Sequence, residues 1–170
     1  MDFKSRIRTV EDFPKPGISF KDITTLLKDG PAFHSAIETM AKHFEGKGIE
    51  VVTGPEARGY IFASALAFRL GAGFVPVRKP GKLPAKTRSI SYALEYGEDS
   101  LEVHEDAFIP GQKVLVVDDL LATGGTIRAT IDLVESLGAK VEGVAFLIEL
   151  SPLGGRKRLQ GYDVISLVQY

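Results

Sequence analysis

The chain has 170 residues, of which 44% are hydrophobic and 25% are charged, so we expect a single globular domain of ordinary soluble composition. Its 21 Lys and Arg against 22 Asp and Glu give a net charge of −1, which argues against a general nucleic-acid or membrane-surface binder. The absence of cysteine excludes disulfides, thiolate metal ligands and a cysteine nucleophile. No apolar run approaches about 20 residues, and the charged first segment predicts a cytoplasmic location.

Helices and strands alternate in the first half of the chain. Asp2 is placed to cap a short helix over residues 3–10, which Pro14 and Pro16 would end. Pro31 suits the first turn of a second, amphipathic helix that Gly46 stops. We then expect a strand over 49–53, a turn over 54–59, a nearly all-apolar and therefore buried helix over 60–70, and a strand over 74–77.

The second half begins with a loop over 78–88 and a hairpin, whose alternating strands 90–96 and 101–104 meet near Gly97. Residues 113–117 are entirely apolar at their centre, which is typical of a central parallel strand. A helix over 127–137 and strands over 141–150 and 164–168 follow. This alternation predicts an α/β fold with a mostly parallel sheet, in which ligands bind beyond the carboxyl ends of the strands.

The most informative segment, residues 114–126, reads VLVVDDLLATGGT. Asp118 and Asp119 follow an apolar strand, and a loop of small residues then opens a helix. Such a loop binds anions, because glycines let backbone N–H groups approach closely and the helix N-terminus adds its dipole. Adjacent carboxylates suit sugar hydroxyls or a divalent cation, so the pattern favours a ribose 5-phosphate. The alternative is a glycine-rich turn whose acids only cap the helix.

All thirteen positions of this string resemble the phosphoribosyl pyrophosphate (PRPP) motif of type I phosphoribosyltransferases. The resemblance implies that Asp118 and Asp119 hydrogen-bond the ribose 2′- and 3′-hydroxyls, near a Mg²⁺ ion bound mainly through pyrophosphate. It also implies that the 5′-phosphate is held by the loop residues Ala122, Thr123, Gly124, Gly125 and Thr126.

Three further segments are similar to the adenine phosphoribosyltransferase family: FPKPGISFKDI over 13–23, RKPGKLP over 78–84 and YALEYG over 92–97. The resemblance covers nearly the whole chain. It implies a type I phosphoribosyltransferase-like fold, with helices flanking the sheet, an N-terminal base-binding hood (residues 1–29) and a flexible hairpin lid (residues 78–106). The implied activity is a pentosyl transfer from PRPP to adenine, giving AMP and pyrophosphate in purine salvage, by a Mg²⁺-dependent homodimer.

The same resemblance assigns an adenine site. Phe20 and Leu120 would sandwich the base, and Lys21 and the Ser19 backbone lie where the family reads its edge. Relatives commonly carry Arg at the position of Lys21. Plain core packing is the alternative role for Phe20.

The pyrophosphate is implied to bind at the turn that contains Glu56, Ala57 and Arg58, where relatives often carry Asp-Ser in place of Glu56-Ala57. The family has a non-proline cis peptide in this turn. Arg58 is the candidate catalytic cation, because its planar fork suits phosphate oxygens. The lid contributes Lys79 and Lys82, two of five cations in an acid-free run that also holds Arg78, Lys86 and Arg88.

The remaining implied residues lie on the hairpin. Glu95 is the family's candidate for handling the purine proton, although spacing alone favours an exposed strand acid. Tyr96 either hydrogen-bonds in the closed site or packs.

Two rival functions remain. The first is transfer to another purine base, hypoxanthine or xanthine, against which the Phe20 segment argues, because 6-oxopurine enzymes usually read the base after the PRPP motif. The second is a non-catalytic PRPP-sensing regulator, for which we expect a DNA-binding domain or a broad basic surface that this chain lacks.

Overall fold

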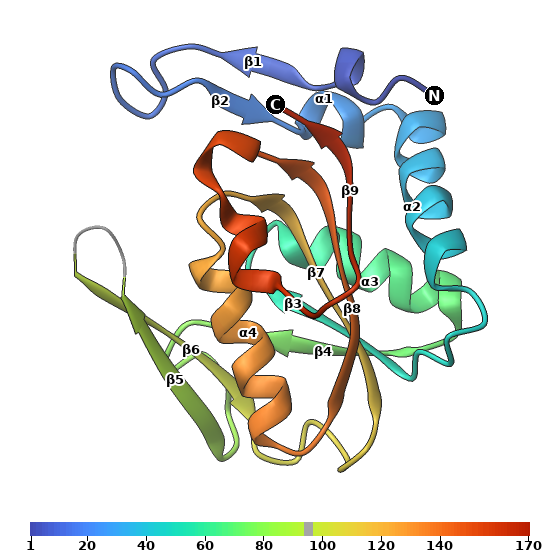
Figure 1. Cartoon of the computed structure of the whole chain (residues 1–170), viewed down its shortest axis with the longest axis vertical. Helices are drawn as coiled ribbons and strands as arrows, with labels where there is room; N and C mark the ends of the chain where they lie inside the picture. The colour runs from blue at the N-terminus through green and yellow to red at the C-terminus, as the bar shows by residue number, and fades with distance from the viewer. Residues whose placement is uncertain (94–96) are drawn as a thin grey trace.

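A computed structural model describes residues 1–93 and 97–170. Its centre is a five-stranded sheet in which every neighbouring pair is parallel, in the order β4-β3-β7-β8-β9 (Figure 1). The predicted α/β architecture is therefore confirmed. The strands are β3 (Val51–Pro55), β4 (Gly73–Val77), β7 (Lys113–Leu121), β8 (Lys140–Glu149) and β9 (Val164–Gln169).

Helices cover both faces of this sheet. Leu115 and Val117 of β7 pack with α2 (Gly30–Phe44) and α3 (Gly59–Leu70), whereas Val114 and Val116 pack on the opposite face with α4 (Gly125–Ser136). Successive side chains of a strand point to opposite faces, so a strand covered on both sides must be apolar throughout. This is why β7 shows no polar alternation.

The hood (residues 1–29) lies over the carboxyl ends of the central strands, at the top of Figure 1. The helix predicted over 3–10 is wrong. Only Lys4–Arg6 forms a 3-10 turn, and β1 (Arg8–Val10) pairs antiparallel with β2 (Phe20–Asp22). The partner strand lies ten residues or more further along, so the local apolar spacing does not reveal it. A short helix, α1 (Thr24–Leu27), completes the hood.

The predicted hairpin is confirmed as a separate two-stranded sheet of β5 (Thr87–Ala93) and β6 (Glu98–His104) that projects beside α4 (Figure 1). Thr87 and Arg88 belong to β5 rather than to the preceding loop. Arg78 ties the hairpin to the end of β4 by a bridge to Glu102. Residues 94–96 of the predicted first strand lie outside the described residues.

Helix α3 is not fully buried, contrary to the expectation from its composition. Phe62 and Leu66 are fully buried, but Phe68 is 90% exposed and Ile61 is 37% exposed. The helix packs against the sheet and α2, and the described residues leave Phe68 and Ile61 uncovered. Within the described residues, no helix combines the length and apolarity that crossing a membrane requires.

Candidate active site

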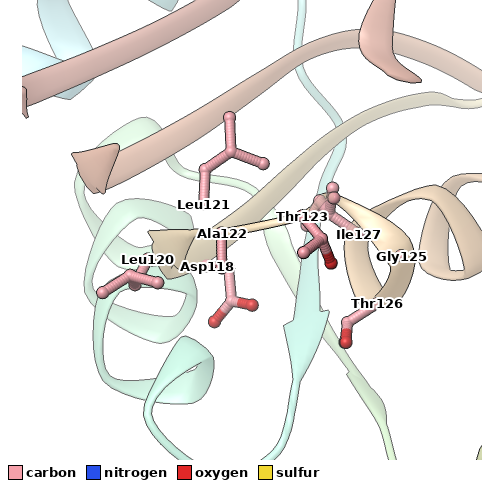
Figure 2. Close-up of a pocket in the computed structure, with 9 residues that line it drawn as sticks. Asp118, Leu120, Leu121, Ala122, Thr123, Gly125, Thr126 and Ile127 are labelled. Carbon is pink, nitrogen blue, oxygen red and sulfur yellow. The ribbon is translucent and has the colours of Figure 1, made fainter. Parts of the chain in front are cut away.

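The phosphate loop (residues 122–126) joins the end of β7 to the start of α4, as the sequence predicts. It lines a small cavity with Asp118 and Leu120 (Figure 2). The side-chain oxygens of Asp118, Thr123 and Thr126 lie on the same side of the backbone in this view. A carboxylate, two hydroxyls and the N-terminus of a twelve-residue helix therefore border one space, which is the arrangement that a phosphate next to sugar hydroxyls requires.

The shape of the loop depends on two glycines from different parts of the chain. Gly124 has a φ of +83°, and a Cβ added to it would lie 2.8 Å from the Gly155 carbonyl oxygen. A Cβ added to Gly155 would lie 2.3 Å from the Ala122 carbonyl oxygen. The segment after β8 thus packs backbone to backbone against the loop. The sequence motif includes Gly124, but sequence reasoning missed Gly155, because only the fold brings the two together.

An ion pair between a buried carboxylate, Glu149, and the half-exposed Arg156 holds this second segment in place. The Arg156 Nε–H donates to both carboxylate oxygens of Glu149, at 3.0 and 3.1 Å, and its Nη1 donates to the Val164 carbonyl at 2.9 Å. The Arg156 guanidinium lowers the pKa of Glu149 below its ordinary value. Two 3-10 turns, Ser151–Leu153 and Gly155–Leu159, are anchored in this way behind the phosphate loop.

The acid pair lies at the end of β7, which extends to Leu121 rather than stopping at residue 117 as predicted. Asp118 is half-buried and Asp119 is 4% exposed. Burial, followed by the charge of Asp119, raises the pKa of Asp118 well above its ordinary range. Burial also raises the pKa of Asp119, against the opposing effect of Arg58. Ionising both carboxyls without a ligand therefore costs free energy.

Arg58 connects the acid pair to the hood. Its Nε lies 2.8 Å from Asp119 Oδ2, yet no N–H or O–H of the described residues makes a well-directed hydrogen bond to that oxygen. The contact is therefore an ion pair with an acceptor to spare. The Arg58 guanidinium carbon also lies 5.3 Å from the centre of the Phe20 ring, within cation–π range. The expected sugar-binding and base-binding residues thus meet at one side chain.

Phe20 lies on β2 in an aromatic part of the hood. Its ring makes an edge-to-face contact with Phe13, with centroids 5.2 Å apart. Both rings line an open groove, with a volume of about 300 Å³, together with Val10, Asp22 and Thr24. Phe20 is half-buried rather than sealed in the core, so one part of its surface is available to a flat ligand. Leu120 lines the phosphate-loop cavity.

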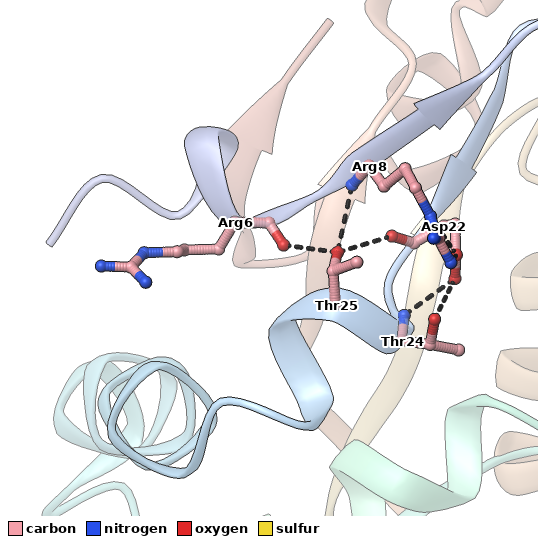
Figure 3. Close-up of polar contacts among 5 residues, drawn as sticks. All are labelled: Arg6, Arg8, Asp22, Thr24 and Thr25. Carbon is pink, nitrogen blue, oxygen red and sulfur yellow. Dashed lines mark hydrogen bonds and ion pairs between the residues drawn. The ribbon is translucent and has the colours of Figure 1, made fainter.

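Side-chain hydrogen bonds fix the strand that carries Phe20 (Figure 3). Asp22 Oδ1 accepts from the Thr24 N–H at 2.9 Å and the Thr24 hydroxyl at 2.7 Å, and Oδ2 accepts from the Arg8 Nε–H at 3.0 Å. The hydrogen bonds from Thr24, followed by that from Arg8, lower the pKa of Asp22 to about 2. The Thr25 hydroxyl donates to the Arg6 carbonyl at 2.7 Å. The two strands of the hood are thereby tied to its helix, α1.

Lys21 has its ammonium occupied within the hood. It donates to the Ser19 hydroxyl at 3.1 Å and to the Thr9 hydroxyl at 3.2 Å, and it lies 4.4 Å from the centre of the Tyr170 ring. Ser19 also donates to Glu11 at 3.1 Å. A contact of Lys21 with a base stays a prediction.

The turn after β3 contains a cis peptide bond between Glu56 and Ala57, as the resemblance implies. Glu56 does not face the phosphate loop through its carboxylate. That group accepts from the Lys79 backbone N–H at 2.6 Å and from Arg78 Nη2 at 3.2 Å, and the Lys79 N–H is the main cause of its lowered pKa. Glu56 therefore anchors the start of the lid, while Ala57 and Arg58 are exposed.

The lid contacts the phosphate loop through a chain of polar groups. The Lys79 ammonium pairs with Asp99, and the Tyr92 hydroxyl lies 3.3 Å from Asp99 Oδ2 and 3.2 Å from Thr126 Oγ1. Sequence reasoning included Tyr92 as the first residue of the segment YALEYG and did not single out Asp99. Lys82, Lys86 and Arg88 are exposed. Glu95 and Tyr96 lie outside the described residues.

The acid pair also fits a magnesium ion held mainly by a ligand. Within the described ranges, no group of three or more His, Cys, Asp or Glu is arranged to hold a metal. Asp118 and Asp119 nevertheless place two carboxylates side by side, and Asp119 Oδ2 can accept a further bond. Mg²⁺ is usually bound through one or two carboxylates plus substrate phosphates, so these residues are consistent with it.

Comparison with known proteins agrees with this geometry. A model of the phosphoribosyl transferase domain matches residues 24–168, so fold and site define a phosphoribosyltransferase. A Symbiobacterium thermophilum protein named adenine phosphoribosyltransferase is 88% identical over 170 residues, covering 100% of both chains. The crystal structure of adenine phosphoribosyltransferase from Thermoanaerobacter pseudethanolicus is 60% identical, with a TM-score of 0.95, over 98% of this chain and 97% of that one. The chain therefore belongs to the adenine phosphoribosyltransferases.

More distant structures share the fold over the same length. The adenine phosphoribosyltransferase of Saccharomyces cerevisiae, crystallised with an imino-altritol bisphosphate and adenine, is 37% identical. Its TM-score is 0.91, over 96% of this chain and 95% of that one.

Proposed function

We infer that the chain transfers the 5-phosphoribosyl group of PRPP to N9 of adenine, giving AMP and pyrophosphate. The observation that carries this inference is the position of Arg58, which lies 2.8 Å from Asp119 and 5.3 Å from the Phe20 ring. A ribose held by the acids and a base stacked on Phe20 would be neighbours, as a glycosidic bond between them requires. The S. cerevisiae relative was crystallised with adenine, which supports the same base here.

We propose that PRPP binds along the edge formed by β7 and the turn after β3. The phosphate loop holds the 5′-phosphate, and Asp118 and Asp119 accept hydrogen bonds from the ribose hydroxyls. Accepting them offsets the penalty of burying two neighbouring carboxylates, of which Asp119 is paired with Arg58. Arg58, Lys79 and Lys82 hold the pyrophosphate, and Ala57 and Glu56 shape the turn beneath it. Asp118 and Asp119 would help to hold a Mg²⁺ ion, which would supply charge neutralisation when bound with the substrate.

The chemistry follows from where charge develops. The bond between C1′ and the pyrophosphate oxygen breaks, and both of its electrons leave with pyrophosphate. The ribosyl group passes through an oxocarbenium-like state before the N9 lone pair forms the new bond. Arg58 and the lid lysines stabilise the leaving anion, which is usually the largest catalytic contribution. Glu95 accepts the proton that adenine loses.

The decisive experiment is product analysis with PRPP, Mg²⁺ and a panel of adenine, hypoxanthine, xanthine and guanine. We expect AMP and pyrophosphate from adenine and no nucleotide from the oxopurines. IMP or XMP as the main product would favour the rival base specificity, and binding of PRPP without turnover would favour the regulator. Activity should disappear in excess chelator and return with Mg²⁺.

The role of Glu95 is tested by Glu95→Gln. The amide keeps a hydrogen bond but cannot accept the proton, so kcat should fall at least about tenfold, within the range of general acid–base effects. Glu98→Gln is the matched control, because Glu98 is an exposed carboxylate on the same hairpin. An unchanged kcat, with chemistry rate-limiting, would return Glu95 to the role of a surface acid.

We also propose a homodimer. Phe68, Ile61 and Phe74 are 90%, 37% and 36% exposed on α3 and β4, and Phe74 makes an edge-to-face contact with Tyr60. Exposed aromatic groups on one side of a molecule favour association. Sedimentation should give a dimer at micromolar concentration, and Phe68→Lys should shift it toward a single chain. The cytoplasmic location stays a prediction.

A further inference from the structure

Tyr92 is the lid residue whose side chain contacts the phosphate loop. Its ring packs against the first residue of α4, since a Cβ added to Gly125 would lie 3.6 Å from Tyr92 Cδ2. Its hydroxyl lies 3.2 Å from Thr126 Oγ1 and 3.3 Å from Asp99 Oδ2. Through this one side chain, the lid contacts a hydroxyl of the 5′-phosphate site.

The direction of these hydrogen bonds follows from the groups involved. The Lys79 ammonium, the largest influence on Asp99, lowers the pKa of that carboxyl, so Asp99 is ionised and can only accept. Tyr92 has one hydroxyl hydrogen, and it donates this hydrogen in its hydrogen bond to Asp99. Thr126 must then donate its own hydrogen to the Tyr92 oxygen. In this arrangement the Thr126 hydroxyl has no hydrogen left for a phosphate.

Phosphate binding reverses the direction of these hydrogen bonds. When Thr126 donates to a phosphate oxygen, its own oxygen becomes free to accept from Tyr92. The Tyr92 hydroxyl then donates to Thr126 in place of Asp99. Asp99 can release that hydrogen because it keeps two other donors, the Lys79 ammonium and the Ser100 N–H at 2.9 Å. A hydroxyl that accepts one hydrogen bond donates the next more strongly.

We propose that Tyr92, whose ring packs against Gly125, is a positioning residue for the 5′-phosphate of PRPP and acts through Thr126. This proposal rests on the proposed function of the phosphate loop. Tyr92 contributes more to the bound state than to the free state, because only in the bound state does it donate to Thr126 and direct the Thr126 hydrogen toward the phosphate. The lid thereby completes the phosphate site as well as the pyrophosphate site.

The test is Tyr92→Phe, which keeps the ring against Gly125 and removes only the hydroxyl. We expect the KM for PRPP and the Kd for ribose 5-phosphate to rise about three- to tenfold, the effect of one hydrogen bond. The kcat and the Kd for pyrophosphate should stay within about twofold of wild type, and the Tm within about one degree. Ser91→Ala is the matched control, since it removes an exposed hydroxyl from the adjacent position, where its partner is Ser100.

A double-mutant cycle tests the route through Thr126. In a Thr126→Val background, Tyr92→Phe should have no further effect, whereas in a Thr126→Ser background its full effect should return. Additive effects in the Val background, or an unchanged Kd for ribose 5-phosphate in Tyr92→Phe, would overturn the proposal. Wild-type protein that binds ribose 5-phosphate but does not convert PRPP and adenine to AMP would overturn only the proposed function. Wild type that does not bind it would overturn both.

Discussion

The phosphate loop and the hood contribute to the proposed site by opposite means. The loop (residues 122–126) is contiguous in sequence and presents mainly backbone, shaped by close approach to Gly155. The hood presents Phe20 from a short strand that is held by side chains, above all Asp22 with Arg8 and Thr24. An anion site built from backbone depends on the absence of a Cβ, whereas an aromatic surface depends on which side chains hold its strand.

The carboxylates of the two regions differ in the same way. Burial raises the pKa of Asp118 and Asp119, so their ionised forms destabilise the folded protein when no ligand is bound. Hydrogen bonds from Thr24 and Arg8 lower the pKa of Asp22 to about 2, so that acid stabilises the fold. In the proposed function, the acid pair stores unfavourable free energy that a substrate can relieve, whereas Asp22 does not.

The largest effect is expected from Gly124→Ala. The added Cβ would lie 2.8 Å from a backbone oxygen at a φ of +83°, so the loop must move. Displacements of about 1 Å can cost about 100-fold in rate, and we expect kcat/KM for PRPP to fall by at least that factor. Gly161→Ala is the control, because it has a φ of +91° and nothing within 4 Å of the added Cβ. It should lower the Tm and leave steady-state kinetics intact. Equal losses of kcat/KM in both variants would mean that the close approach at Gly124 has no specific role in the site.

Asp118→Asn should lower activity while stabilising the ligand-free protein. Loss of one charge-assisted hydrogen bond to ribose predicts about a 10- to 100-fold fall in kcat/KM for PRPP. The folded-state pKa of Asp118 is raised, so its ionisation destabilises the wild type as pH rises above the ordinary carboxyl pKa near 4. The Tm advantage of the variant should therefore be absent below about pH 4 and grow toward neutral pH. Melting curves over this range would measure it, with exposed Asp106→Asn as the control. A lower Tm at neutral pH would contradict the assignment.

Phe20→Ala should affect one substrate only. Stacking of a base on an aromatic ring is worth roughly 1–3 kcal/mol, so the KM for adenine should rise about tenfold while that for PRPP stays within about twofold. Steady-state kinetics with each substrate varied would show this. Phe13→Ala, which removes the exposed neighbouring ring, should have a smaller effect. If Phe20 only packs, the Tm should fall and both KM values should stay unchanged.

The smallest effect is expected from Asp22→Asn. Loss of hydrogen bonds in an exposed network costs about 1 kcal/mol, which corresponds to a Tm lower by about 2–4 °C. The folded-state pKa is depressed, so this stabilisation exists above the ordinary carboxyl pKa and is lost as pH falls toward about 2. The Tm gap between wild type and variant should close between about pH 4 and pH 2. A gap that is constant with pH would mean that the carboxylate charge is not involved.

Much of the fold and site could be predicted because the relevant residues are neighbours in sequence. The apolar strand, the two acids and the small-residue loop follow one another over residues 114–126, and their order alone indicates a strand, an anion site and a helix. The cis peptide at Glu56-Ala57 was anticipated by resemblance and is present. Helix α2 begins where Pro31 places it, with Asp29 accepting from the Ala32 N–H at 3.1 Å.

The remaining features depend on contacts between distant residues. The pairing of β1 with β2 replaced a predicted helix, and β8 extends β7 past its apolar core to Leu121, so that Asp118 and Asp119 lie on a strand. The contact of Gly155 with Gly124 and of Tyr92 with Thr126 likewise has no local signature. The sequence by itself determined the chemistry of the site, because residue types and short spacings are local. Tertiary structure alone decided which groups hold that chemistry in place, because hydrogen bonds and close backbone approaches form between segments that only folding brings together.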